Sequence, residues 1–372
     1  MFNLKKKNFK NLDLILLLSL FFLIGYGLYV LNSATNGMGA SYLKSQIIAT
    51  ALGFFLMIML LFIDIDFVKK LQWPFWIISV LLLGLTLVFG HGDSMGARAW
   101  LKIGPVNFQP AEFVKLMLVV SLSSFIEKRK EKISRPLTLL AILIYAAIPI
   151  GLIFLQPDLG TSMVLLFMLV AMLFVNGLNL AYFFGALISA VIAFPIFYNH
   201  LDGYQKERIL NFLDSSRNAE SNYQIAHGRI AIGSGGIYGK GYLQGAINQN
   251  GFVPERHTDY IFAVLVEELG LIGACFLILA YGLLLWRMVK IAKNAKDSFS
   301  SSVATGYTAM LFIHIFENIG MTIGLMPVTG IPLPLMSYGG TFQIVVMLAI
   351  GAVISIGLER KQLDFSYKIG EK

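Results

Sequence analysis

The chain has 372 residues, a formal net charge of +8, 57% hydrophobic residues and only 13% charged residues, with a mean hydropathy of +0.73. Soluble domains average about 45–50% apolar and about 25% charged residues, so this composition excludes a soluble protein and indicates an integral membrane protein. The basic residues stand in short stretches between apolar runs, which is typical of topology signals and argues against nucleic-acid binding. The single cysteine, Cys275, excludes an intrachain disulfide framework.

Ten apolar runs are long enough to cross a bilayer as helices, which takes about 20 residues each. The runs lack strand alternation, and helices satisfy their own backbone hydrogen bonds in lipid. The sequence therefore predicts one all-α membrane domain over residues 1–372 with ten transmembrane helices. The predicted spans are residues 13–32, 45–63, 71–89, 110–126, 136–155, 161–177, 179–199, 259–286, 302–324 and 342–358.

The basic residues set the expected orientation, because Lys and Arg are enriched in cytoplasmic loops. With the N-terminus inside, 19 of the 29 Lys and Arg residues fall in cytoplasmic segments. Both termini are then cytoplasmic. The long loop of about residues 200–258, between the seventh and eighth spans, is expected to be extracytoplasmic. No cleavable signal peptide is expected, because the first apolar run is long and lacks a small-residue cleavage site.

Polar residues occur just before and inside the fourth span. The motif GARAW contains Arg98 and ends at Trp100, which is a candidate for substrate binding, although Trp is also common at membrane interfaces. Glu112 and Lys115 stand three residues apart, so they share a helix face and can pair. Such a pair is either a structural clamp or the wall of a polar cavity.

Asp158 stands in a short predicted outer turn, within the motif QPDLGT. Asp is a favoured N-cap residue, so Asp158 caps the sixth span, serves an active site, or does both.

The long loop combines cations with glycines. Arg208, Arg217 and Lys240 lie in it, the last in GSGGIYGKG. Guanidinium groups bind phosphate bidentately, so these residues are candidates for binding a pyrophosphate or polyanionic headgroup; the alternative is an ordinary solvated loop. GSGGIYGKG does not have the spacing of a nucleotide-binding P-loop, and the five histidines form no zinc-protease pair. ATP-driven transport and zinc proteolysis are therefore disfavoured.

The most informative stretch is residues 251–268, GFVPERHTDYIFAVLVEE, because Asp259 stands where a polar loop changes into an apolar helix. An acid at such a boundary is costly to desolvate, which indicates a chemical role; a helix cap is the alternative. In the ninth span His314, Glu317 and Asn318 are expected to form helix–helix hydrogen bonds.

The proline- and glycine-rich segment 326–341 follows the ninth span and cannot form a regular helix. At membrane depth such backbone must be buried in protein or line a cavity. Ser337 in this segment is a further candidate for substrate binding.

Seven motifs, in this order between about residues 96 and 340, resemble the SEDS family of bacterial shape, elongation, division and sporulation proteins. Arg256 before His257 favours the elongation branch, RodA, over the division branch, FtsW. The predicted spans extend the resemblance to nearly the whole chain. The motifs are GARAW, QPAEFVK, QPDLGTS, YQKERI, GRIAIGSGGIYGKG, PERHTDYIFAVLVEELG, and NIGM with GIPLPLMSYGG.

The resemblance implies a peptidoglycan glycosyltransferase of the bacterial cytoplasmic (inner) membrane. Such an enzyme polymerises lipid II into glycan strands for cell elongation and rod shape and releases undecaprenyl pyrophosphate. The implied partners are a class B penicillin-binding protein, which is a transpeptidase, and the rest of the elongation machinery. Two alternatives stay open: a lipid II flippase, since many spans around a polar cavity also suit a transporter, and a scaffold that only positions the penicillin-binding protein.

The resemblance also implies roles for individual residues. Asp259 corresponds to the essential catalytic acid residue, Trp100 and Asp158 to positions important in the family, and Glu112 and Lys115 to its central cavity. We expect Asp259 to act as general base. No cofactor is required; a divalent cation, Mg²⁺ or Mn²⁺, is left open as a helper in neutralising the pyrophosphate. The candidate cations for that task are Arg98, Lys115, Arg208 and Arg217.

Overall fold

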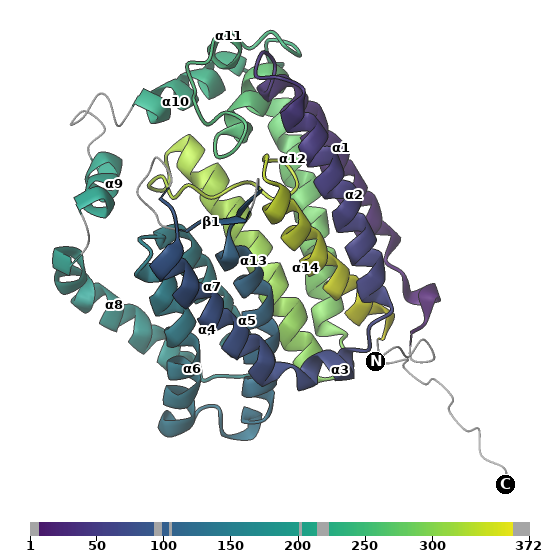
Figure 1. The fold of residues 1–372 in the computed structure, drawn as a ribbon, viewed down its shortest axis with the longest axis vertical. Coiled ribbons are helices and arrows are strands. Elements are labelled where there is room, and N and C mark those ends of the chain that lie inside the picture. Colours follow the sequence, from purple (N-terminus) through teal and green to yellow (C-terminus); the bar gives the residue numbers. More distant parts are fainter. Residues whose placement is uncertain (1–6, 93–98, 104–105, 201–202, 214–222, 360–372) are drawn as a thin grey trace.

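The computed structural model describes residues 7–92, 99–103, 106–200, 203–213 and 223–359 (Figure 1). In these ranges every predicted span corresponds to one helix. Those helices are α1 (Leu14–Ala34), α2 (Ser41–Leu61), α4 (Gln72–Phe89), α5 (Pro110–Glu127), α6 (Pro136–Phe154), α7 (Leu159–Val175), α8 (Leu180–His200), α12 (Ile261–Lys293), α13 (Ser298–Ile323) and α14 (Gly340–Leu358).

Shorter elements connect these helices. They are the 3-10 helices η2 (Phe9–Asn11) and η3 (Lys130–Lys132), the helices α3 (Ile65–Lys70), α9 (Gly203–Leu213), α10 (Tyr223–Gly235) and α11 (Ala246–Gln249), and the strands β1 (Leu101–Ile103) and β2 (Val106–Phe108). The two strands pair antiparallel, with Leu101 opposite Phe108. The fold class is thus all-α, as expected, with one small hairpin.

Seven of the described helices are long and apolar enough to cross a membrane: α1, α2, α4, α6, α12, α13 and α14. The described apolar parts of α7 and α8 are shorter, and α5 carries Glu112, Lys115 and Glu127 within its 18 residues. The chain is therefore a multi-pass membrane protein, while the number of ten crossings stays a prediction.

The connections between helices gather at two ends of the bundle. The upper end in Figure 1 carries α10 and α11, the lower end carries α3, and the hairpin lies below α10, nearer mid-height. The first and last described residues meet at the lower end, where the Asn8 amide donates to the Leu358 carbonyl over 3.1 Å.

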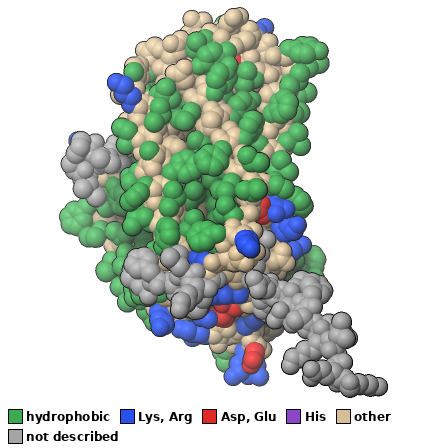
Figure 2. Space-filling view, turned by 90° about the vertical axis from the view of Figure 1, so that its right-hand side faces the viewer, with side chains coloured by type: hydrophobic (Ala, Val, Ile, Leu, Met, Phe, Trp, Pro, Cys, Tyr) green, Lys and Arg blue, Asp and Glu red, His purple; other side chains and the backbone are tan. Residues whose placement is uncertain are grey.

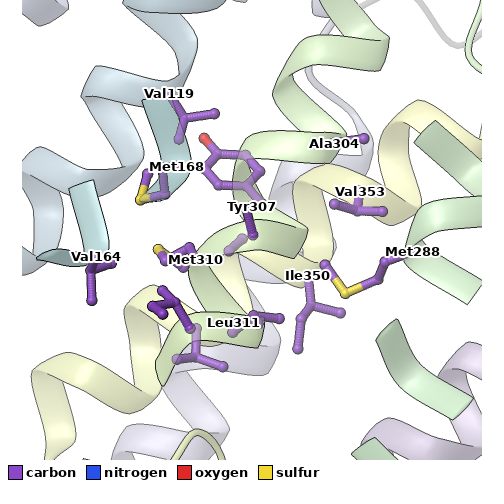
Figure 3. Packing of buried hydrophobic residues seen from close by; sticks show 14 of the residues in the cluster. Val119, Val164, Met168, Met288, Ala304, Tyr307, Met310, Leu311, Ile350 and Val353 are labelled. Atoms are coloured by element: carbon purple, nitrogen blue, oxygen red, sulfur yellow. The ribbon is translucent and has the colours of Figure 1, made fainter. Parts of the chain in front are cut away.

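The core is built around α13, which packs against α5, α7, α12 and α14. This helix begins after Asp297, whose side chain accepts a hydrogen bond from the Ser300 amide, and ends at Gly324 in the left-handed conformation. Figure 3 shows Tyr307 of α13 beside Val119 of α5, with side chains of α7, α12 and α14 around it. Because neighbouring helices enclose α13 on several sides, its polar residues lie inside the bundle.

The outer surface matches a bilayer. On the side of the molecule where α1 and α2 lie, hydrophobic side chains cover the upper and middle parts, while Lys, Arg, Asp and Glu gather at the lower end (Figure 2). Leu18 of α1 and Ile48 of α2 are among the exposed apolar residues of these two helices. At the lower end, Arg287 binds both carboxylate oxygens of Asp13. Ion pairs therefore hold the part of the bundle where the apolar surface ends.

Helix α12 is interrupted at Gly270, where φ is +67°. On either side of the break its backbone pairs with the segment 236–241: Leu271 donates to the Gly236 carbonyl over 2.9 Å, and the Lys240 amide donates to the Glu267 carbonyl over 2.9 Å. A Cβ at Gly270 would lie 2.3 Å from the Ile237 carbonyl oxygen, so only glycine fits here. The glycine-rich part of the predicted long loop is thus docked onto a transmembrane helix.

Candidate functional site

Asp259 lies in a turn at the upper end, immediately before α12, and is 8% exposed. The turn is closed by a hydrogen bond of 3.0 Å from the Tyr260 amide to the Glu255 carbonyl and by one of 2.9 Å from the Thr258 hydroxyl to the Glu255 carboxylate. The cap position of α12 is occupied by Tyr260 and not by Asp259. The sequence turn PERHTDY is therefore a folded unit in which Glu255 closes the turn and Asp259 is held, largely buried, just before α12.

The irregular segment 325–339 packs directly against this turn. The Ser337 hydroxyl donates to the Thr258 carbonyl over 2.6 Å and accepts from the Leu333 amide over 2.8 Å. The Tyr338 amide donates to the His257 carbonyl over 2.9 Å. The prediction that this proline- and glycine-rich backbone is buried in protein is confirmed at residues 331 and 333–337.

Other helices hold the segment in place. The Gln46 side chain of α2 donates to the Ser337 carbonyl and accepts from the Gly339 amide, both over 3.1 Å. Leu335 is buried with φ at +65°, a conformation that is strained for a residue with a side chain. Its carbonyl oxygen would lie 2.1 Å from a Cβ at Gly27, so glycine in α1 is what lets the strained residue approach.

Arg256 is committed to backbone. Its guanidinium donates to the carbonyls of Ala34 (2.8 Å), Asn36 (3.2 Å) and Asn248. Burial lowers the pKa of this guanidinium from its ordinary value. Arg256 therefore ties the Asp259 turn to the end of α1 and to α11, which its sequence neighbours do not predict.

The adjacent carboxylates of Glu267 and Glu268 hold the residues next to Arg256. Glu267 accepts from the backbone amides of Ile247 (2.8 Å) and Asn248 (3.1 Å). Glu268 accepts from the Ser33 hydroxyl over 2.5 Å. Neither acid was singled out from the sequence, because both stand inside an apolar helical run whose neighbours come from distant parts of the chain.

An aromatic group surrounds His257. The ring of Tyr42 makes edge contacts with His257 and with Tyr338, both at 5.1 Å between centroids. Burial lowers the pKa of the His257 imidazole, with Glu255 acting against that shift and Arg256 adding to it. Burial thus favours the neutral form of the imidazole.

A second polar cluster lies inside the bundle, between α5 and α13. The buried Lys115 ammonium lies 2.9 Å from the Glu112 carboxylate and 2.9 Å from Nε2 of His314. Because Nδ1 of His314 lies 2.8 Å from the Met310 carbonyl, Nδ1 carries the proton and Nε2 accepts from Lys115. The predicted pairing of Glu112 with Lys115 is confirmed, and His314 joins it.

Asp158 caps α7. Its carboxylate accepts from the Thr161 amide over 2.9 Å and from the Thr161 hydroxyl over 2.8 Å. The capping interpretation is confirmed, and the active-site interpretation stays a prediction. Asp158 and Lys115 are both within electrostatic reach of Glu317, which is fully buried.

The remaining candidates fall into two groups. Trp100 is half-buried and accepts from the His91 amide over 2.8 Å through its carbonyl, and the Lys240 side chain is exposed. Arg98 and Arg217 lie outside the described residues, as does the side chain of Arg208 in α9. In the described part of the chain, no group of three or more His, Cys, Asp or Glu residues is placed to hold a metal ion.

Comparison with known proteins identifies the family. The model of the cell cycle proteins FtsW, RodA and SpoVE matches residues 7–362. The chain belongs to this family. The relatives include the peptidoglycan glycosyltransferase MrdB of Escherichia coli K12, which is 38% identical over 369 residues covering 98% of this chain and 99% of MrdB. Stage V sporulation protein E of Bacillus subtilis 168 is 32% identical and covers 92% of this chain and 96% of its own length.

Solved structures agree with this membership. A chain from a peptidoglycan synthase complex described as coordinating polymerization and crosslinking has a TM-score of 0.84 and 32% identity, covering 94% of this chain and 99% of that one. The rod shape determining protein RodA of Thermus thermophilus has a TM-score of 0.72 and 30% identity, covering 94% and 98%. The resemblance to the RodA-containing family, stated from the motifs, is thus confirmed.

Proposed function

We propose that this chain is a peptidoglycan glycosyltransferase that polymerises lipid II into glycan strands for cell elongation. The observation that carries the proposal is the full-length similarity to the glycosyltransferase MrdB, combined with an acid held in a tightly bonded turn at one end of a membrane bundle. In this proposal the upper end faces the outside of the cytoplasmic membrane, where lipid II is presented, and both termini are cytoplasmic.

Asp259 is the proposed general base. It takes the proton of the GlcNAc 4-hydroxyl of incoming lipid II, and the oxygen attacks the anomeric carbon of the lipid-linked MurNAc. The bond from that carbon to the pyrophosphate oxygen breaks, and its electron pair leaves with undecaprenyl pyrophosphate. One inversion gives a β-1,4 link. Glycosidases use a second carboxyl group to protonate a poor leaving group; a pyrophosphate needs only neutralisation of its charge.

The proposed neutralising cations are Lys240, whose side chain is exposed at the upper end, and Arg98, Arg208 and Arg217. Lys115 is engaged with Glu112 and His314, so it contributes to the electrostatic field inside the bundle more than to direct phosphate contact. Trp100, Glu112, Asp158 and Ser337 complete the proposed substrate-binding set. A divalent cation, Mg²⁺ or Mn²⁺, remains a proposal that an assay with a chelator would test.

The proposed partner is a class B penicillin-binding protein. The similar chain in a synthase complex for polymerization and crosslinking supports a partner that crosslinks the strands.

The test compares Asp259→Asn with Asp297→Asn. The first replaces the proposed base with an isosteric amide, and loss of a general base typically costs about 10²–10⁴ in rate. The second makes the same change at the cap of α13, where Asn also caps well. Purified protein with its partner and labelled lipid II should give glycan strands for the wild type and Asp297→Asn only. Strands formed by Asp259→Asn at the wild-type rate would refute the assignment.

The flippase alternative has one observation in its favour, the buried cluster of Glu112, Lys115, His314 and Glu317 inside the bundle. Sealed vesicles loaded with labelled lipid II separate the two functions. Glycan strands indicate a polymerase, whereas a change of sidedness without strands indicates a flippase.

A further inference from the structure

The side chain of Asn318, in α13, binds the backbone of Asp259. It is fully buried, and Nδ2 donates to the Asp259 carbonyl over 2.9 Å and to the Ile331 carbonyl over 2.7 Å. This orientation is forced, because a flipped amide would set its oxygen against two carbonyl oxygens. Both hydrogens of the amide are therefore used to join the Asp259 turn to the 325–339 segment.

Ser337 makes a matching contact one peptide earlier. Its hydroxyl donates to the Thr258 carbonyl. The Thr258 carbonyl belongs to the peptide unit before the Asp259 Cα, and the Asp259 carbonyl belongs to the unit after it. Peptide units are planar, so the two dihedral angles between them are the only soft backbone freedom at Asp259. Holding both units fixes the direction of its Cα–Cβ bond.

We propose that Asn318 and Ser337 are positioning residues that aim the Asp259 carboxylate through its backbone. This inference rests on the proposed function of Asp259 as general base. It changes the interpretation of Ser337 from a substrate-binding residue to one that acts through Asp259, and that of Asn318 from helix packing to a role in the reaction.

The surroundings support a functional reason for the contact. Oδ1 of Asn318 is buried without a hydrogen-bond partner in the described part of the chain, which is unfavourable for packing alone. The segment that Asn318 binds, and to which Ser337 belongs, also contains the strained residue Leu335. Unsatisfied buried polar atoms and strained backbone persist where surrounding structure enforces a geometry, and they cluster at functional sites.

The test measures kcat and KM for lipid II with the partner present, in Asn318→Ala, Ser337→Ala and the double variant. Small displacements of a catalytic group cost up to about 100-fold in rate, so we expect each single variant to lose about 10- to 100-fold in kcat with KM changed by less than about threefold. Because both residues hold one turn, the loss in the double variant should be smaller than the product of the single losses.

Asn176→Ala is the matched control. Asn176 is also a buried amide, and its Nδ2 donates to Met172 over 2.8 Å and to Ser302 over 3.1 Å. The contact with Ser302 joins the end of α7 to the lower part of α13, away from the Asp259 turn. A thermal unfolding curve for each variant reports the stability change, and Asn176→Ala should be destabilised while keeping the wild-type kcat.

Three results would overturn the inference. The first is wild-type kcat in folded Asn318→Ala or Ser337→Ala. The second is a kcat loss in Asn176→Ala equal to theirs, since that would reduce the effect to stability. The third is a wild-type protein that forms no glycan strands from lipid II. That result refutes the proposed function itself, and it is told apart from the other two because it does not depend on any variant. If Asn318→Ala does not fold, Ser337→Ala decides by the same criterion.

Discussion

Replacing Lys115 with Met should destabilise the bundle by about 3–5 kcal/mol, the usual cost of removing one partner of a buried ion pair. The structure sets this scale. Lys115 is 1% exposed, and its ammonium lies 2.9 Å from a Glu112 carboxylate that is itself 3% exposed. At an effective dielectric constant of about 20, that distance corresponds to an attraction of about 6 kcal/mol before desolvation is subtracted.

The double variant Glu112→Gln with Lys115→Met should recover most of the loss, because neither member of the ion pair is then left as a buried charge without its partner. Lys69→Met is the matched control. Lys69 pairs with Glu127, but its side chain is 34% exposed, so the change should cost at most about 1 kcal/mol. The unfolding free energies of the wild type, the two Lys→Met variants and the double variant can be compared by SDS titration in mixed micelles. Equal losses in Lys115→Met and in the double variant would refute the reasoning.

Three further predictions address other parts of the site. Asp158→Ala should lower the unfolding free energy by about 1 kcal/mol through loss of the α7 cap, as a denaturation series in detergent would show; no change would contradict the capping role. Gly27→Ala should strongly destabilise the protein, because the new Cβ would lie 2.1 Å from the Leu335 carbonyl oxygen. Gly25→Ala in the same helix is the control: its Cβ would meet no atom within 4 Å, so it should be neutral or stabilising. Similar melting temperatures for the two variants would be inconsistent with the packing. The pKa of His257 is lower in the folded protein than its ordinary value of about 6.5. As the pH falls below that value, the unfolded chain binds a proton at His257 more readily than the folded chain does. The free energy of unfolding therefore decreases as the pH falls. In His257→Asn the unfolding free energy should depend less steeply on pH between about 6.5 and 5, measured against wild type.

The positions of the membrane helices could be predicted closely because a hydrocarbon environment leaves few choices. The run predicted as 71–89 is the helix Gln72–Phe89, and the run 342–358 is Gly340–Leu358. The largest error concerns α12, predicted to end at 286. It continues to Lys293 because its last turns carry Arg and Lys, which an apolar count rejects but a helix end tolerates.

The site was predicted in part. Local sequence was enough for the contact between Glu112 and Lys115, which are three residues apart in one helix, and for the Asp158 cap, because Asp is a favoured residue before a helix. The contacts of Arg256 and Asn318 could not be predicted, since their partners lie far away in sequence. Arg256 reaches Ala34, and Asn318 reaches back to Asp259. No local sequence pattern predicts that two carbonyl groups from distant parts of the chain will bind one side chain.

The break at Gly270 divides α12 into two parts that share one support. Above the break, the Glu267 and Glu268 carbonyls accept from the amides of Lys240 and Gly241. Below it, the Leu271 amide donates to the Gly236 carbonyl. The segment 236–241 therefore acts as a splint across the interruption, and the start of α12 at the Asp259 turn keeps a fixed direction relative to the rest of the helix although the helical hydrogen bonding is broken between them.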